Sequence, residues 1–333
     1  MNIIDEKYDV VILTHAPKDA LVISIEKLLN QKNVPVNIII YNTDENLFYK
    51  NISHESKLKK YVNNEHGYNT NIKLINIDKK DFDHGKSRND ASKLVSSKYI
   101  LFMTDDAIPY DDNLTLNLIE VFYKYETNDK RVAVAYARQI ASENATLKEK
   151  YVREFNYKEF DEIKEKDKES RLGIKNYFCS NVCAMYDREI FNSLGGFEEN
   201  IILNEDTYFA YKCIKKGYRV IYVSNAKVYH SHNLNYREQF SRNVDIGVSQ
   251  CQKKEIFGSV SSSKEGIKLI CYVVGKLFIG LHFIKIVDFI IECFYRYLGF
   301  RCGLRYETYS IDKCISYANN KYYFIKRKNN SHV

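Results

Sequence analysis

The 333-residue sequence has no tryptophan, three prolines, and eight cysteines with no Cys-x-x-Cys pair among them. Closely paired cysteines are the usual ligands of structural zinc, so this spacing argues against a zinc module. A disulfide framework needs a secretory context, and the first residues, MNIIDEKYDVVIL, place acids before the apolar run instead of forming a signal-peptide pattern. We therefore expect reduced, buried thiols and a cytoplasmic location.

The sequence also lacks the two common glycine-rich phosphate-binding motifs. No Gly-x-Gly-x-x-Gly occurs, and Gly85–Ser87 matches only the end of a P-loop, because position 80 is Lys and charged residues precede it. No signature of a nucleic-acid-binding fold is present. The most apolar stretch, Lys264–Arg301, is interrupted by charges throughout, unlike a spanning helix of about 20 apolar residues.

The composition that remains is that of a globular protein, with 45% hydrophobic and 28% charged residues. The length suits one large α/β domain with a smaller appendage. The net charge of +7, concentrated toward the carboxyl terminus, favours an anionic partner such as a sugar nucleotide or a lipid head group.

Short apolar runs alternate with amphipathic helical segments along the first part of the chain. This alternation is typical of βαβ units and predicts an α/β fold with a mostly parallel, doubly wound sheet flanked by helices. Glu143–Arg171 is dense in charge and is expected to be a solvated helical excursion without a strand. The expected strands are 9–13, 36–41, 72–77, 100–103, 132–136, 182–186 and 218–223.

Two domains are expected, a sheet domain over residues 1–240 and a helical, basic and apolar region over residues 241–333. In the helical region, charged residues recur every two to three helical turns among apolar residues, which gives a mainly apolar helix a polar edge. Attachment to a membrane surface is one interpretation, and burial against the sheet domain or a partner subunit is the other. The sequence leaves both open, together with a homo-oligomer.

The stretch Tyr99–Pro109, YILFMTDDAIP, is a buried strand that runs directly into two carboxylates. Ligands of open α/β sheets bind at the carboxyl ends of the strands, so Asp105 and Asp106 are expected to face a ligand. The alternative role of helix capping is better filled by Asp111 and Asp112, which precede an apolar helix.

Three further groups carry candidate chemistry. The segment Asp83–Ala91 opens a helix with several donors and positive charges that suit an anion, although it could be a polar loop with Ser87 as the helix cap. Glu205 and Asp206 form a second acidic pair, which a helix dipole alone would explain. His230 and His232 follow a strand and could bind metal or make ordinary hydrogen bonds.

The order of these motifs is similar to that of family 2 glycosyltransferases, which have the GT-A (Rossmann-like) nucleotide-sugar-binding fold. The loop FDHGKSRNDA also resembles the F-x-H-G-x-x-R-N-x-A pattern of the rhamnosyltransferase branch. The second strand departs from the family, since it ends in YNTDEN instead of an aspartate-rich sequence. The resemblance covers roughly residues 8–245 and rests on VVILTHA, TDDA, GGF at 195–197, EDTYFAYKCIKKGYRVIYV and VYH.

The resemblance implies a metal-dependent, inverting hexosyltransferase. Asp106 and His230 would hold Mg²⁺ or Mn²⁺ on the donor diphosphate, with His232 as the rival ligand. Asp206 would be the general base, and Glu205 would strengthen it through like-charge repulsion. The expected donor-binding residues are Thr14, His15, Asp44, His84, Lys86, Arg88, Asn89, Asp105 and Arg242.

The first expected donor is dTDP-L-rhamnose, transferred to a hydroxyl of a glycan or lipid-linked acceptor at the inner face of the cell membrane during surface polysaccharide synthesis. A UDP-hexose or UDP-galactofuranose donor on the same fold is the alternative enzyme. A catalytically inactive GT-A module that binds a glycan is the alternative that is not an enzyme. A nucleotidyltransferase is less consistent, because THAPKDA is not the glycine-rich, basic loop that it would need after the first strand.

Overall fold

The computed structural model describes residues 3–257 and 263–330, which form two compact units. The first unit comprises Met1–Ile140, Tyr157–Glu198 and Asp206–His230, and the second comprises Ala141–Asn156, Glu199–Glu205 and Ser231–Val333. Each unit is therefore assembled from three segments of the chain. The boundary predicted after residue 240 falls within helix α9 (Tyr236–Gln252), and a functional division there stays a prediction.

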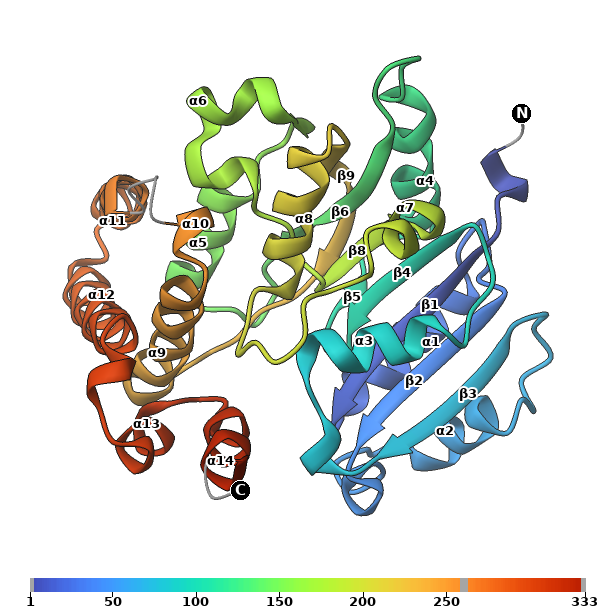
Figure 1. The fold of residues 1–333 in the computed structure, drawn as a ribbon, viewed down its shortest axis with the longest axis horizontal. Helices are drawn as coiled ribbons and strands as arrows, with labels where there is room; N and C mark the ends of the chain where they lie inside the picture. The colour runs from blue at the N-terminus through green and yellow to red at the C-terminus, as the bar shows by residue number, and fades with distance from the viewer. Residues whose placement is uncertain (1–2, 258–262, 331–333) are drawn as a thin grey trace. The chain divides into compact units, whose positions relative to one another are not determined.

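The described part of the first unit is built on a nine-stranded sheet in the order β3-β2-β1-β4-β8-β6-β9-β5, with β7 paired to β9 (Figure 1). The strands β1 to β4 are parallel, as the βαβ pattern predicts, whereas β8 is antiparallel to both of its neighbours. The sheet is therefore mixed. The strands are β1 (Tyr8–His15), β2 (Asn37–Thr43), β3 (Asn71–Ile77), β4 (Tyr99–Thr104), β5 (Ile108–Pro109), β6 (Val132–Ile140), β7 (Glu162–Lys164), β8 (Cys183–Asp187) and β9 (Arg219–Tyr229).

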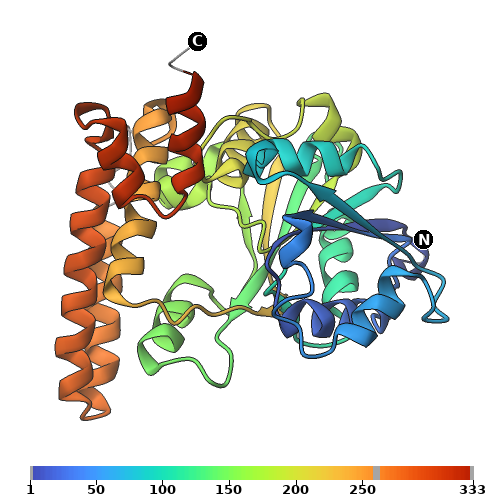
Figure 2. The ribbon, with the colours of Figure 1, turned by 90° about the horizontal axis from the view of Figure 1, so that it is seen from below.

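Helices cover both faces of this sheet (Figures 1 and 2). One face is packed by the apolar sides of α1 (Asp19–Leu29), α2 (Glu55–Val62) and α4 (Leu114–Lys124), which bury aliphatic side chains against β1, β2 and β4. The other face carries α3 (His84–Ser92), α7 (Arg188–Ser193) and α8 (Glu205–Lys215). There an aromatic cluster joins β4 and β8 to α7 and α8; its members are Phe102, Tyr186, Phe191, Phe197 and Phe209.

The second unit is helical, as predicted for the carboxyl-terminal region. Its helices α9 and α12 approach closely where glycine replaces a side chain: a Cβ on Gly299 would lie 2.2 Å from the carbonyl oxygen of Phe240, and one on Gly303 would lie 2.2 Å from that of Val244. None of the described helices is long and apolar enough to cross a membrane. Besides α9, the helices are α5 (Leu147–Asn156), α10 (Lys254–Phe257), α11 (Ser263–Ile279), α12 (Phe283–Gly303), α13 (Ile311–Tyr317) and α14 (Lys321–Asn330).

One local prediction is wrong. The stretch Glu143–Arg171, expected to lack a strand, contains β7 (Glu162–Lys164), which pairs antiparallel with β9, besides α5 and the short helix α6 (Glu169–Leu172). The strand was missed because its only apolar residue is Ile163, between two charged ones. Lys164 is nevertheless buried, with its ammonium donating to the carbonyl oxygen of Phe178, and burial lowers its pKa to about 7.

Candidate active site

The acidic end of β4 meets the end of β1, as the parallel register requires. Leu13 is aligned with Thr104, so Thr14 lies beside Asp105, and the Thr14 hydroxyl donates to Asp105 Oδ2 at 2.7 Å. Burial raises the pKa of Asp105 to about 6, the Thr14 hydrogen bond opposes this shift, and the neighbouring carboxylate of Asp106 adds to it. The structure thus brings together the predicted donor-binding residues Thr14 and Asp105 and the predicted metal ligand Asp106.

The second carboxylate, Asp106, lies beside His230, which follows β9. Their Oδ1 and Nε2 atoms are 3.5 Å apart, and His230 is almost fully buried. The other ring nitrogen, Nδ1, is 2.9 Å from Oε1 of Gln139, whose amide nitrogen donates to the Ser180 hydroxyl. Because this amide oxygen can only accept, Nδ1 carries a proton and donates to it, and Nε2 is the nitrogen that faces the carboxylate.

At 3.5 Å, Nε2 and the carboxylate of Asp106 can be joined by a proton on Nε2 or can bind one cation together. Imidazole and carboxylate are both common ligands of divalent metals, and a hydrogen bond to the remote ring nitrogen is the usual way to orient such a histidine. Gln139 was not identified from the sequence, since it is the penultimate residue of β6 and belongs to no motif. Its role is visible only when β6 and β9 are seen as neighbours.

The ends of β1 and β2 hold two residues in left-handed backbone conformations, Ala16 (φ 51°) and Asp44 (φ 79°). Such conformations are uncommon outside glycine and tend to occur at functional sites, where the surrounding structure maintains them. Between them, His15 Nδ1 is 3.0 Å from the carbonyl oxygen of Thr43. His15 and Asp44 are therefore both located at the strand edge that also carries Asp105.

The second acidic motif is tied to the same edge through β8. The Thr104 amide donates to the carbonyl oxygen of Val182 at 3.2 Å, and the next amide back along the chain, Asn181, donates to Asp206 Oδ2 at 2.9 Å. The other oxygen of Asp206 accepts from the Thr207 amide at 2.7 Å. These backbone donors fix the carboxylate in one orientation next to the acidic end of β4.

The segment Asp83–Ala91 comprises the N-cap and nearly all of α3. Asp83, and not Ser87, is the N-cap, and its carboxylate accepts from the Lys86 amide at 2.8 Å. The Lys86 ammonium pairs with Asp90 at 2.6 Å. Arg88 is buried and its guanidinium donates to the carbonyl oxygen of His84 at 3.0 Å. His84, Lys86 and Arg88 thus lie in one turn, and their binding to a donor stays a prediction.

This segment also docks onto the GGF turn. Asn89 makes two hydrogen bonds to Phe197, accepting from its amide and donating to its carbonyl oxygen, each at 2.9 Å. A Cβ on Gly85 would lie 1.9 Å from the carbonyl oxygen of Glu198, and Gly196 has a positive φ of 70°. The glycines and the Asn of the two motifs therefore hold the segment against the turn, a packing role that the sequence did not indicate.

Three predicted residues belong to the second unit. Glu205 is buried at the start of α8, Arg242 is exposed on α9, and His232 follows His230 by two residues. Arg242 lies one helical turn before the buried Asp245, and its charge acts on that carboxyl. Their participation in the active site stays a prediction.

The family is identified from the amino-acid sequence. Residues 9–195 match the family described as Glycosyl transferase family 2, a span that includes Asp105 and Asp106. The chain belongs to this family. The resemblance inferred from its motifs is thereby confirmed.

Two curated relatives of this family 2 glycosyltransferase cover most of its length. It is 34% identical to the O-antigen chain rhamnosyltransferase RfbN of Salmonella typhimurium over 76% of the chain and 80% of the relative. It is 31% identical to the O-antigen chain rhamnosyltransferase WbaN of Salmonella anatum over 88% of each.

Solved structures support the fold. The mannosyltransferase PcManGT from Pyrobaculum calidifontis, in complex with GDP-Man and Mn²⁺, matches with a TM-score of 0.56 and 9% identity over 90% of this chain and 87% of its own. S. aureus TarS (residues 1–349), in complex with UDP-GlcNAc, matches with a TM-score of 0.50 and 16% identity over 91% and 92%. The predicted GT-A fold of this glycosyltransferase, with its helical carboxyl-terminal region, is confirmed.

Proposed function

We propose that the protein transfers L-rhamnose from dTDP-L-rhamnose to a hydroxyl of a glycan or lipid-linked saccharide in surface polysaccharide synthesis. The observation that carries a transferase site is the meeting of Asp105, Asp106, His230 and Asp206 at one edge of the sheet. The donor is supported by the two relatives named as O-antigen chain rhamnosyltransferases and by the loop FDHGKSRNDA. An acceptor on a lipid would place the protein at the inner face of the cell membrane.

A divalent metal fits the residues present. Asp106 and the Nε2 lone pair of His230 would hold it, and Gln139 would keep the imidazole in the ligating tautomer. Bound there, Mg²⁺ or Mn²⁺ would neutralise the charge that develops on the departing nucleoside diphosphate. The solved mannosyltransferase of the same fold contains Mn²⁺ with its GDP-Man, and oxygen ligands suit either ion.

The chain's own residues would perform the remaining steps. The carboxylate of Asp206, oriented by the amides of Asn181 and Thr207, would accept the proton of the attacking acceptor hydroxyl. Attack from the face opposite the diphosphate would invert the configuration of the anomeric carbon through an oxocarbenium-like transition state. Glu205 would increase the basicity of Asp206 by like-charge repulsion.

The donor would lie along the ends of β1, β2 and β4. Asp105, held by Thr14, would contact the ribose, and Asp44 with His15 would face the base. The donors and positive charges of α3, namely His84, Lys86 and Arg88, would face the phosphates or the sugar, and Asn89 would hold this segment through its hydrogen bonds to Phe197. Arg242 would close over the diphosphate.

A calorimetric titration with nucleotides tests this proposal. We expect dTDP and dTDP-L-rhamnose to bind more tightly than UDP or GDP, and only with Mg²⁺ or Mn²⁺ present. Asp106→Ala should weaken metal-dependent binding at least about tenfold. Asp111→Ala is the matched control, because this nearby acid follows β5 and accepts from the Asn113 amide instead of facing a ligand.

Each other outcome changes the proposal in a defined way. Tighter binding of UDP sugars would replace the donor with a UDP-hexose or UDP-galactofuranose. Equal binding with and without metal would remove the metal site. Absence of nucleotide binding would favour the catalytically inactive glycan-binding module.

A further inference from the structure

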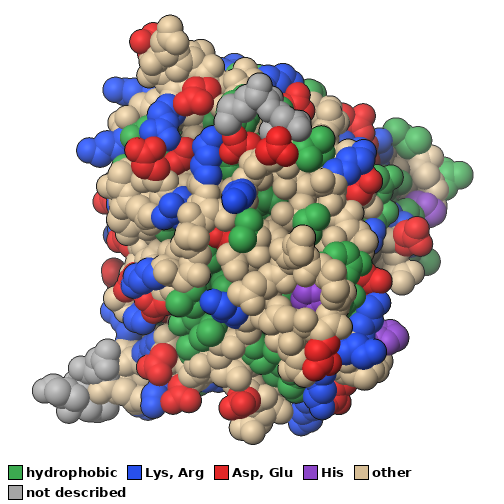
Figure 3. All heavy atoms as spheres, turned by 90° about the vertical axis from the view of Figure 1, so that its right-hand side faces the viewer, with side chains coloured by type: hydrophobic (Ala, Val, Ile, Leu, Met, Phe, Trp, Pro, Cys, Tyr) green, Lys and Arg blue, Asp and Glu red, His purple; other side chains and the backbone are tan. Residues whose placement is uncertain are grey.

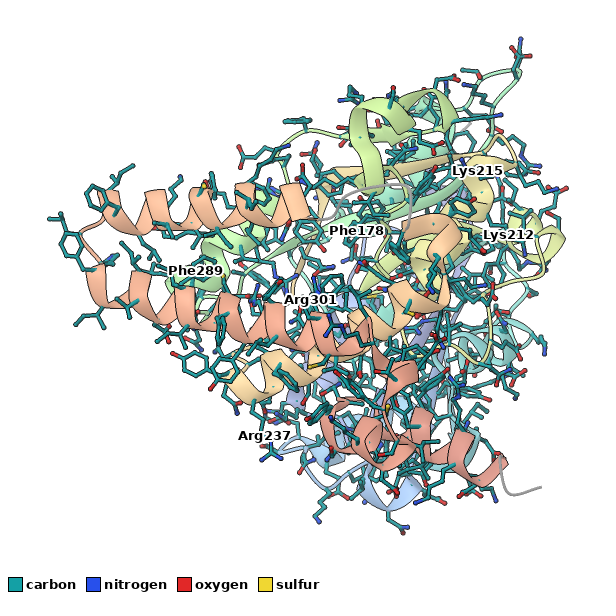
Figure 4. All side chains as sticks on the ribbon, turned by 60° about the vertical axis from the view of Figure 1, so that its left-hand side comes forward. Phe178, Lys212, Lys215, Arg237, Phe289 and Arg301 are labelled. Carbon is teal, nitrogen blue, oxygen red and sulfur yellow. The ribbon has the colours of Figure 1, made fainter. Side chains whose placement is uncertain are left out.

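Helices α11 and α12 of the second unit form an antiparallel hairpin that is covered on one side only. Val273 and Leu277 of α11 and Phe289 of α12 are fully buried, and they pack with apolar residues of α5. Figure 4 shows the two helices side by side, with Phe289 on the side where they face each other. The inner side of the hairpin is therefore an ordinary hydrophobic core.

The opposite side exposes large apolar side chains, most of all at the turn between the helices. There Ile279 is 81% exposed, Leu281 72% and Ile284 86%, and Phe278 and Phe283 are more than half exposed. A half-exposed large apolar side chain exposes about 100 Å² of surface. At this value, the tip and the outer face of α12 together expose roughly 1,000 Å² of apolar surface. A typical monomer exposes no contiguous apolar patch beyond a few hundred Å².

The pattern continues along α12 with helical spacing. Exposed Ile284, Val287, Ile291, Phe294 and Leu298 follow one another three or four positions apart. This spacing places them in one stripe on the outer side of the helix. The apolar surface is therefore continuous from the tip along most of α12.

The hairpin carries more positive than negative charges. Residues 263–303 contain six Lys or Arg and three acids, Glu265, Asp288 and Glu292. Glu265 pairs with Lys268, and Asp288 and Glu292 are both engaged by Lys148 of α5, at 2.8 and 2.5 Å. Lys276, which pairs with Glu154 of α5, and the exposed Lys285 flank the tip, and on the face of the molecule in Figure 3 acids and bases are interspersed.

We infer that the tip of this hairpin, residues 278–284, inserts into the interface of an anionic lipid bilayer. Apolar side chains flanked by cations match a surface whose head groups are negative and whose interior is apolar. A second copy of the chain complements the tip poorly in charge, because the exposed charge beside it, Lys285, is positive in both copies. The hairpin would lie at the membrane surface, since neither helix is long and apolar enough to cross it.

Co-sedimentation of the full chain with lipid vesicles tests the inference. We expect the protein to pellet with vesicles that contain phosphatidylglycerol, and to pellet much less with pure phosphatidylcholine. The double substitution Ile279→Asp/Ile284→Asp should lower the fraction bound to anionic vesicles at least tenfold. Phe160→Asp is the matched control, because Phe160 is 61% exposed in the first unit and receives the same change.

A second variant separates charge from apolar insertion. Lys285→Gln should weaken binding to anionic vesicles and leave the small binding to neutral vesicles unchanged. Equal pelleting by the wild type and the Ile279/Ile284 variant would refute the inference. So would equal binding to neutral vesicles, or self-association in light scattering that the double variant abolishes, which would assign the face to a second copy. The assay contains no sugar nucleotide, so its failure would leave the proposed transferase function standing.

Discussion

Replacing Asp206 with Asn should separate catalysis from binding. Each carboxylate oxygen accepts one backbone amide, from Asn181 at 2.9 Å and from Thr207 at 2.7 Å. An Asn side chain has one acceptor, so one of the two amides loses its partner, at a cost of about 1–3 kcal/mol in the free energy of unfolding. A domain with a stability of about 5–15 kcal/mol remains folded after this loss.

The effect on catalysis should be much larger. A positioned general base contributes about 10²–10⁴-fold to the rate, equivalent to about 3–5 kcal/mol in activation free energy. Release of dTDP from dTDP-L-rhamnose, measured at saturating donor and acceptor, should therefore fall by that factor in Asp206→Asn. Donor affinity, measured by calorimetry, should change less than about threefold, because Asp105 and Asp106 are intact.

The control is Asp187→Asn, at the other end of β8. Asp187 also accepts a backbone amide, that of Ile190 at 2.9 Å, and pairs with Arg131 at 2.9 Å. Its loss should cost a similar 1–3 kcal/mol or so in stability but leave kcat unchanged. If Asp206→Asn retains its kcat, or if Asp187→Asn loses as much, Asp206 is not the base.

Three further outcomes follow from single residues. His230→Ala should raise the metal concentration for half-maximal donor binding at least about tenfold in a titration with Mn²⁺. Burial raises the pKa of Asp245 from 3.8 to about 7, so the folded state binds this proton more tightly than the unfolded state. The contribution of this proton to the free energy of unfolding is complete below about pH 4 and is lost as the pH rises toward 7, at about 1.4 kcal/mol per pH unit. Chemical denaturation at several pH values should show this contribution in the wild type but not in Asp245→Asn. Gly85→Ala should destabilise the protein in thermal unfolding, because its Cβ would lie 1.9 Å from the carbonyl oxygen of Glu198, whereas Gly275→Ala, with nothing within 4 Å, should be neutral or slightly stabilising.

The sequence predicted those features that depend on local pattern. The parallel strands β1, β2 and β4 have continuous apolar runs, and Asp105 directly follows β4, so its position was accessible from the sequence. Strand β7 was missed because three residues with one apolar side chain give no periodic signal. Its structure is decided by pairing with β9 and not by its own residues.

The roles of Gln139 and Asn89 could not be predicted for a different reason. Gln139 faces His230 because β6 and β9 are neighbours in the sheet, although 91 positions separate them, and Asn89 reaches Phe197 across 108 positions. Sequence motifs consist of residues that are close together in the chain. They therefore identified the residues expected to face a ligand but not the distant residues that contact them.

The side chains that orient such residues come from any strand that the topology brings alongside. The ligand candidate His230 follows a strand in a recognisable VYH motif, whereas the Gln139 that fixes its tautomer occupies an unremarkable strand position. If Gln139 orients His230 for metal binding, Gln139→Glu should tighten metal binding, because it adds a negative charge to the partner of the imidazole. Gln139→Leu should weaken metal binding while His230 stays in place. Both variants can be compared with the wild type in the Mn²⁺ titration, and equal affinities in all three would show that the tautomer is set by something other than this hydrogen bond.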